Sequence, residues 1–266
     1  MEGFTFFIGI LGNVTSMLVF LAPIDTFKRI VKNKSTEEFD SLPYICSLLS
    51  ASLWTYYGIV QPSAFLVGTI NAFGSILGIV YVGLFLFYAP PSNKVKIALI
   101  VGTLNVGFLV GAILFTRLAF KGEARVASMG FLAAGFIIVT YASPLSSMRT
   151  VVMTRSVEYM PFYLSFFIFL SGGVWALYGW LIGDYFVSVP NGTGCILGTA
   201  QLVLYGIYRD TKPPARDSAC VSFYDLEEGW QRQPLLSSTH SLVSSTHSLV
   251  SSAHSLLASG HSFLES

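Results

Sequence analysis

The sequence is poor in charge, in cysteine and in histidine. Charged residues make up only 11% of the 266 residues, less than half of the roughly one quarter that is usual in soluble domains. The three cysteines, Cys46, Cys195 and Cys220, are odd in number and widely spaced, which favours neither a disulfide framework nor a metal site. A net charge of +1 gives no reason to expect a nucleic-acid partner. With no histidine before residue 240 and no paired carboxylates, an enzyme is not expected, nor is a cofactor.

What the chain has instead is long hydrophobic stretches, since 53% of its residues are hydrophobic. Helices of about 20 residues can cross about 30 Å of hydrocarbon. Lipid offers no partner to backbone polar groups, so helices are expected rather than open strands. The sequence therefore predicts an all-α integral membrane protein in contact with the lipid bilayer. Its seven transmembrane helices are expected over residues 4–27, 41–60, 65–88, 96–118, 126–148, 159–182 and 187–208.

Basic residues indicate which way the helices face. Lysine and arginine are concentrated after the first, third, fifth and seventh predicted helices, whereas the opposite side has only Arg117, Lys121 and Arg125. Because basic loops tend to stay in the cytosol, we expect a cytosolic C-terminus and an N-terminus outside the cell or in a lumen.

The chain also resembles itself at an offset near 120 residues, which indicates a tandem repeat. The matched residues are Pro23 with Pro144, Pro43 with Pro161, Trp54 with Trp175, Tyr57-Gly58 with Tyr178-Gly179 and Asn71 with Asn191. Each copy covers three helices, and the helix left between them makes the two copies parallel. We expect a three-helix bundle over residues 1–90, a linker helix in 91–120 and a second bundle over 121–210. Parallel repeats of this kind enclose a site between them.

Residues 211–266 differ in composition from the rest. They contain four serine-rich heptads, each with one histidine: His240, His247, His254 and His261. A metal-binding or coiled-coil tail is one interpretation. The dominance of serine favours a disordered cytosolic tail, and the heptads lack the charged flanks of a coiled coil.

Two tryptophans and two asparagines fall at one depth. Trp54 and Asn71 each lie six residues inside the outer end of their helix, about 9 Å below the edge, and Trp175 and Asn191 lie at a comparable depth. An indole can stack on the C–H face of a sugar, and a carboxamide both donates and accepts hydrogen bonds without burying a charge. Singly, such residues are often belt tryptophans or helix-pairing asparagines. As matched pairs they predict a sugar-binding site.

Other intramembrane polar residues have no such role. Asn13 and Asn105 lack partners in the repeat, and we expect them to be structural. Asp25 and Asp184 lie at or beyond the ends of the predicted helices, so the helix interiors contain no ionisable residue. Intramembrane ionisable groups mark ion pathways. We therefore expect downhill, bidirectional transport without proton or sodium coupling and without a metal.

The repeated residues resemble the SWEET family of plant and animal sugar facilitators, over roughly residues 4–210. They are Pro23, Trp54, Tyr57-Gly58 and Asn71, with their second copies Pro144, Trp175, Tyr178-Gly179 and Asn191. Three further stretches are similar to the family's plant clade of vacuolar fructose and glucose carriers: Ser35-Thr36-Glu37-Glu38-Phe39, Pro190-Asn191-Gly192-Thr193-Gly194 and Glu227-Glu228 with Pro234-Leu235-Leu236. The last stretch also resembles an acidic dileucine sorting signal, which favours an internal compartment over the cell surface.

The resemblance implies roles for nine further residues. Ser50 and Ser171, each four residues before its tryptophan, would line the sugar cavity. Tyr57, Tyr178 and Asp184 would close the outer mouth by ring packing and a hydroxyl–carboxylate hydrogen bond. Four prolines would form the cytosolic gate, two of them ending helices and two opening helices: Pro23, Pro144, Pro43 and Pro161.

The sequence thus predicts a facilitative uniporter for hexoses such as fructose and glucose, working by alternating access. We expect it in the vacuolar membrane, or alternatively the plasma membrane, as a homo-oligomer. A sucrose-preferring facilitator of the same fold remains an alternative, as does a seven-helix receptor or scaffold without transport. A retinal protein would need a lysine in residues 187–208, which contain none.

Overall fold

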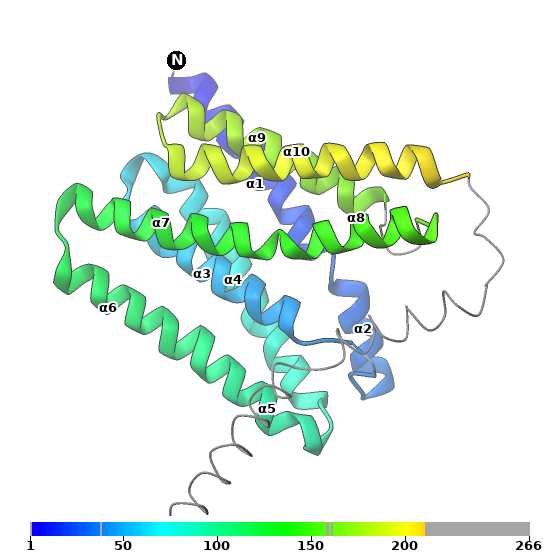
Figure 1. The fold of residues 1–266 in the computed structure, drawn as a ribbon. Helices are drawn as coiled ribbons and strands as arrows, with labels where there is room; N and C mark the ends of the chain where they lie inside the picture. Colours follow the sequence, from blue (N-terminus) through cyan, green and yellow to red (C-terminus); the bar gives the residue numbers. More distant parts are fainter. Residues whose placement is uncertain (1, 38, 158–159, 161, 211–266) are drawn as a thin grey trace, which may run out of the picture. The chain divides into compact units, whose positions relative to one another are not determined.

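A computed structural model describes residues 2–37, 39–157, 160 and 162–210. Pro161, the histidine heptads and Leu235-Leu236 lie outside these residues. The described part belongs to one compact domain, Met1–Pro213. Its secondary structure is helical throughout (Figure 1).

Two three-helix units flank a linker helix, which confirms the predicted three-one-three arrangement (Figure 1). In the first unit α1 (Glu2–Leu21) and α2 (Ile24–Asn33) together make the first of the three spans, and α3 (Leu42–Val60), the short 3₁₀ turn Pro62–Ala64 and α4 (Phe65–Tyr88) follow. The linker consists of α5 (Pro91–Val101), a π-helical stretch (Gly102–Phe108) and α6 (Leu109–Ala119). In the second unit α7 (Gly122–Thr140) and α8 (Ala142–Thr154) together make one span, and α9 (Phe162–Leu181) and α10 (Tyr185–Tyr208) follow.

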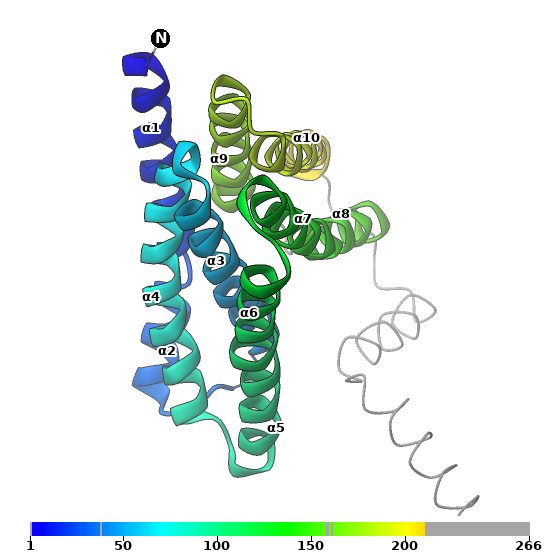
Figure 2. The ribbon, with the colours of Figure 1, turned by 90° about the vertical axis from the view of Figure 1, so that its left-hand side faces the viewer.

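The helices pack with the symmetry of the repeat. Within the first unit α1 and α3 both pack against α4, and within the second unit α7 and α9 both pack against α10. Between the units α1 contacts α9 and α3 contacts α7. Exchanging the two units maps each of these contacts onto another, so the units are related by a pseudo-two-fold axis. The linker runs alongside α3 and leads into α7 (Figure 2).

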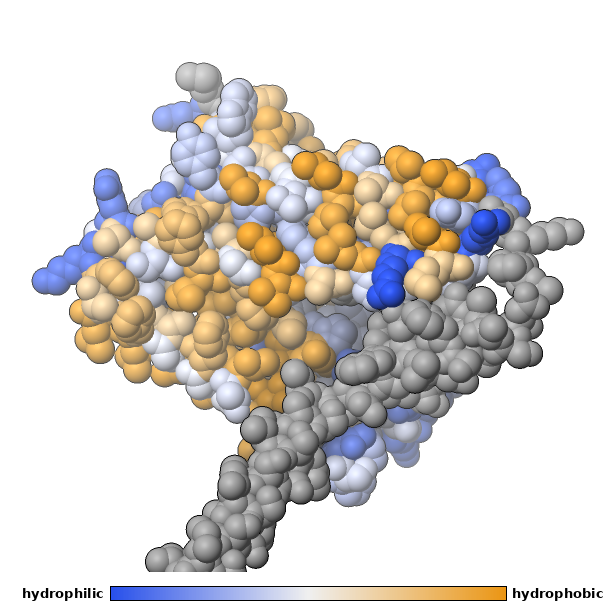
Figure 3. All heavy atoms as spheres, viewed as in Figure 1, coloured by the Kyte–Doolittle hydropathy of each residue, from blue (hydrophilic) through white to orange (hydrophobic). Residues whose placement is uncertain are grey.

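The outer surface of the helices is apolar. Large side chains such as Phe87 and Leu118 are 71% and 82% exposed, and hydrophobic residues spread over the face that carries α6, α7 and α10 (Figure 3). Within the described residues, five spans have the length and hydropathy to cross a membrane: Glu2–Asn33, Pro62–Tyr88, Pro91–Ala119, Gly122–Thr154 and Phe162–Leu181. The other two predicted spans, α3 and α10, have 19 and 24 residues and carry polar residues that line the cavity described below.

Proline positions correct two predicted helix ends. The first helix breaks around Pro23 as expected, but it resumes at Ile24 and continues to Asn33. Pro144 was expected to end its helix and does not, because the break lies at Tyr141 and the proline occupies the first turn of α8. A first turn tolerates proline, since its backbone N–H has no partner there in any case. Pro43 opens α3 as expected.

The repeat extends to backbone conformation. Lys34 ends α2 and Arg155 ends α8, and both adopt the left-handed conformation, with φ of 49° and 51°. The two residues are separated by the repeat offset of 121. A left-handed residue terminates a helix, so both copies turn at the same place.

Two hydrophobic clusters distinguish the ends of the bundle. We name the end with the α3–α4 and α9–α10 turns the outer end and the end with α2 and α8 the inner end, after the sidedness that the sequence predicts. One cluster joins both units through residues such as Leu53, Tyr57, Met129 and Val187. The other cluster, around Phe27, contains described residues of the first unit and the linker alone. Among the described residues, the units therefore share a hydrophobic core at the outer end and not at the inner end.

Candidate functional site

Six residues predicted from the sequence meet around one cavity of about 150 Å³: Ser50, Trp54, Asn71, Ser171, Trp175 and Asn191. Three come from the first unit and three from the second, so the cavity lies on the pseudo-symmetry axis. Its wall is completed by residues that the sequence analysis did not name: Ser16, Val19, Phe20, Val67, Ile70, Ile137 and Val187. The repeat offset could have identified two of them, because Val67 matches Val187 at the offset of 120 that also relates Asn71 to Asn191.

The two tryptophans have the same surroundings. Trp54 and Trp175 are 3% and 6% exposed. Each stands edge-on to the tyrosine three residues later, with ring centroids 5.3 Å apart in both copies. Residues three apart share one face of a helix, so Tyr57 and Tyr178 hold the indoles from the outer side.

The two asparagines also match. Asn71 Nδ2 donates to the Val67 carbonyl and Asn191 Nδ2 donates to the Val187 carbonyl, both at 2.8 Å. Each bond to the preceding turn uses one of the two amide hydrogens. A carboxamide has a second hydrogen and an oxygen besides, so each asparagine keeps a donor and an acceptor for a solute in the cavity.

The predicted outer-gate residues lie together and connect the two units. The Tyr57 hydroxyl donates to Asp184 Oδ2 at 2.7 Å, and the Tyr178 hydroxyl donates to the Ser63 carbonyl at 3.0 Å. Asp184 also caps α10, since its Oδ1 accepts the backbone N–H groups of Phe186 and Val187. Tyr57 and Asp184 are both buried, so the outer end is closed by paired polar groups.

The predicted inner-gate prolines that the structure describes lie at helix starts or breaks. Pro23 is the N-cap of α2, Pro43 is in the first turn of α3 and Pro144 is in the first turn of α8. Each copy thus has a helix break on the inner side of its cavity residues.

None of the described residues that line the cavity is ionisable. Among the described residues there is no group of three histidine, cysteine, aspartate or glutamate side chains placed to hold a metal. The remaining intramembrane asparagines have structural partners: Asn13 donates to Thr69 Oγ1 and Asn105 donates to the Ile45 carbonyl. The cavity is therefore neutral and suits an uncharged, hydroxyl-rich solute.

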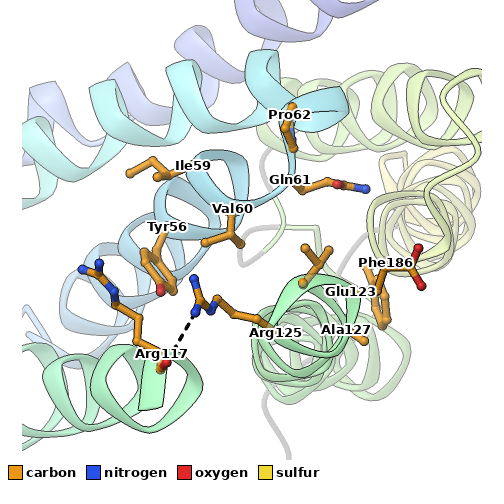
Figure 4. A pocket seen from close by; sticks show the side chains of 12 residues that line it. Tyr56, Ile59, Val60, Gln61, Pro62, Arg117, Glu123, Arg125, Ala127 and Phe186 are labelled. Atoms are coloured by element: carbon orange, nitrogen blue, oxygen red, sulfur yellow. Dashed lines mark hydrogen bonds between the residues drawn. The ribbon is translucent and has the colours of Figure 1, made fainter. Parts of the chain in front are cut away.

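A larger depression of about 890 Å³ lies where the outer ends of α3, α6 and α7 meet (Figure 4). Arg117, Glu123 and Arg125 line it together with apolar residues such as Val60 and Phe186. The Arg125 guanidinium donates to the Arg117 carbonyl (Figure 4). Unlike the smaller cavity, this depression is lined by charged residues and lies to one side of the symmetry axis.

Comparison with known proteins agrees with this geometry. The family model "Sugar efflux transporter for intercellular exchange" matches residues 6–93 and 127–213, one segment in each unit. The chain is 54% identical to Bidirectional sugar transporter SWEET17 of Arabidopsis thaliana over 88% of its length and 98% of that protein. It is 49% identical to SWEET16 of the same plant, over 89% and 100%. A solved eukaryotic SWEET transporter superposes with a TM-score of 0.74 at 39% identity, covering 78% of this chain and 97% of that one.

Proposed function

Since the chain belongs to the SWEET family of sugar transporters, we propose that it carries hexoses such as fructose and glucose through the neutral cavity between its two units. It is a multi-pass membrane protein that transports sugar in both directions, and it is not an enzyme. The observation that carries the choice of site is the meeting of two tryptophans and two asparagines, one pair from each unit, around a cavity without ionisable groups.

Each pair has one task in sugar binding. The indoles of Trp54 and Trp175 stack on the C–H faces of the ring, and the carboxamides of Asn71 and Asn191 exchange hydrogen bonds with its hydroxyls. Ser50 and Ser171 line the same wall and add hydroxyl partners. A neutral lining avoids the cost of burying a charge, which suits a carrier that must bind and release its solute from either side.

Alternating access follows from the difference between the two ends. The Tyr57–Asp184 and Tyr178–Ser63 bonds close the outer end, while the described units share no hydrophobic core at the inner end. We take this arrangement as the inward-facing half of the cycle. Breaking the outer bonds while the chain bends at the helix breaks at Pro23 and at Tyr141, just before Pro144, would close the inner side, and Pro43 and Pro161 would complete that gate.

We place the carrier in the vacuolar membrane with its C-terminus in the cytosol, and we expect a homo-oligomer. The resemblance to the vacuolar clade and the excess of basic residues in the inner loops support this placement. The chain is more similar to Arabidopsis SWEET17, at 54% identity, than to Arabidopsis SWEET13, at 45%. The plasma membrane is the alternative, and imaging the tagged full chain beside vacuolar and plasma-membrane markers distinguishes the two.

Counterflow in proteoliposomes tests the function. Vesicles that contain the purified full chain are preloaded with unlabelled sugar, and entry of radiolabelled fructose, glucose or sucrose is followed over time. We expect transient accumulation of the two hexoses and little of sucrose. Preferential exchange of sucrose would support the sucrose-preferring alternative, and exchange of none of the three would support the receptor or scaffold.

A further inference from the structure

The repeat symmetry breaks at one hydrogen bond inside the cavity. Trp175 Nε1 donates to Ser16 Oγ of α1 at 2.7 Å, and Ser16 Oγ lies 2.9 Å from Ser171 Oγ. The indole N–H of the second unit therefore already has a protein partner. Its hydroxyl acceptor is in turn tied to a second cavity serine.

The equivalent indole of the first unit has no such partner. Trp54 Nε1 is fully buried and has no hydrogen-bond acceptor among the residues that the structure describes. The reason is the residue at the matching place: adding the offset of 121 to Ser16 gives Ile137 of α7, whose side chain cannot accept a hydrogen bond. Trp54 and Ile137 both line the cavity.

A second pair of matched positions that hold different residues increases the difference between the surroundings of the two indoles. A Cβ atom on Gly12 would lie 2.9 Å from Trp175 Cε2, so the missing side chain lets α1 approach that indole closely. The matching position on α7 is Ala133, which is 1% exposed and belongs to the same hydrophobic cluster as Trp54. The Trp175 indole thus meets the Ser16 hydroxyl and a close-packed α1, whereas the Trp54 indole belongs to a cluster with the apolar side chains of Ala133 and Ile137.

From this asymmetry we propose that Trp54 Nε1, which is covered in the described structure, is uncovered when sugar binds and donates a hydrogen bond to one oxygen of the sugar, whereas the N–H of Trp175 stays bonded to Ser16. A buried donor without a partner costs free energy that a bound acceptor restores. A hydroxyl or ring oxygen therefore faces Trp54, and the sugar binds in one orientation although the cavity is nearly symmetric. The inference rests on the proposed function, namely that this cavity is the sugar site.

A pair of matched substitutions separates the two indoles. Trp54→Phe and Trp175→Phe each keep an aromatic ring and remove the N–H. Half-saturation concentrations are measured by counterflow for a transported hexose, for its monodeoxy analogues and for the analogue whose ring oxygen is a methylene. Analogues that lose a bond to an asparagine or serine should bind more weakly in every variant below, and we expect the analogue that lacks the oxygen facing Trp54 to bind about 3- to 10-fold more weakly in the unmodified protein, the usual effect of one neutral hydrogen bond.

The variants should respond differently to that analogue. Trp54→Phe should lose the discrimination, so that parent sugar and analogue have equal half-saturation concentrations. Trp175→Phe should keep the full 3- to 10-fold penalty, whatever its own affinity. Trp180→Phe, which alters a 70% exposed tryptophan outside the cavity, serves as the surface control.

Ile137→Ser provides a second test that leaves Trp54 in place. Its hydroxyl would stand where Ser16 stands in the other copy and would accept from Trp54 Nε1, so discrimination of the same analogue should fall. The inference is overturned if Trp54→Phe discriminates against every analogue as the unmodified protein does, or if the unmodified protein discriminates against none of them. Either result would leave the proposed function intact, whereas absence of any hexose exchange by the unmodified protein would contradict the proposed function itself.

Discussion

The hydroxyl of Tyr57 donates a 2.7 Å hydrogen bond to the carboxylate of Asp184, and this bond joins the two three-helix units at the outer end. Its counterpart joins Tyr178 to the carbonyl of Ser63. The tyrosines are 121 residues apart, and so are Ser63 and Asp184. The outer closure is therefore a pseudo-symmetric exchange in which each tyrosine reaches the turn of the other unit, with a carboxylate acceptor on one side and a backbone acceptor on the other.

Removing the Tyr57 hydroxyl should open the outer end. Tyr57→Phe keeps the ring that packs on Trp54 but loses a bond to a charged group, which is worth about 1.5–3 kcal/mol. We expect the population of outward-facing protein to rise by about tenfold or more. The measurement is the labelling rate of Ser171→Cys, in a background without native cysteines, by an impermeant thiol reagent applied to the outer side of oriented vesicles.

Tyr185→Phe is the matched control for this measurement. Tyr185 lies at the same end and is 77% exposed, so its hydroxyl has no role in the closure. Equal labelling rates in the Tyr57 variant, the control and the unmodified protein would show that the Tyr57–Asp184 bond does not hold the outer end closed.

The sequence predicted which residues meet at the cavity because a tandem repeat shows each of these residues twice, at equivalent positions. Trp54 and Asn71 gained their significance from second copies at one offset, and the fold brings both copies to one cavity. Pro144 was misplaced because proline both ends helices and fits their first turns. Whether Pro144 ends one helix or begins the next depends on the break at Tyr141. The Tyr141 hydroxyl donates to the Pro190 carbonyl of α10, and such a contact between residues distant in sequence cannot be predicted from the local sequence.

The asymmetric part of the site could not be found in this way. A search for matched residues passes over Ser16 and Ile137, because the pair consists of a polar and an apolar residue. The consequence, an indole N–H without an acceptor, depends on side-chain positions. The larger depression with Arg117 and Arg125 was missed for a related reason. Its walls come from α3, α6, α7 and α10, and no two of these helices are equivalent copies in the repeat.

Loss of either cavity asparagine should abolish transport. Asn71→Ala and Asn191→Ala each remove a donor and an acceptor, and a sugar hydroxyl left without them in a buried site loses its partners. We expect uptake into vesicles to fall at least about tenfold for each variant, with unchanged abundance of protein in the membrane. Radiolabelled hexose uptake, normalised to protein, measures this.

Asn93→Ala is the control for the asparagine variants, since Asn93 is exposed at the start of α5. Its uptake should equal that of the unmodified protein. Normal uptake by both cavity variants would remove the assignment of the cavity as the sugar site.

Two glycines beside the gate tyrosines should be intolerant of a methyl group. A Cβ atom on Gly58 would collide with the backbone of Gly68, and one on Gly179 would lie 2.6 Å from the Ser188 backbone nitrogen. A backbone cannot yield as a side chain can, so Gly58→Ala and Gly179→Ala should each destabilise the protein by about 1–3 kcal/mol. Thermal unfolding of the detergent-solubilised protein tests this. Gly83→Ala, also within a helix but with open space around the added methyl group, should not lower the melting temperature, and a similar fall in all three variants would contradict the close-approach argument.

Transport should be indifferent to ion gradients. A coupled carrier needs a group that takes up the proton or ion with the sugar, and such groups are ionisable residues facing the pathway. Here the cavity wall consists of serine, asparagine, tryptophan and aliphatic or aromatic side chains, and Asp184, the carboxylate buried at the outer end, is bonded to Tyr57 and to the backbone at the start of α10. Collapsing a pH gradient across the vesicle with an ionophore should therefore leave the final ratio of internal to external hexose at unity. Accumulation above the external concentration that disappears with the ionophore would mean that Asp184, or a residue outside those described, takes part in coupling.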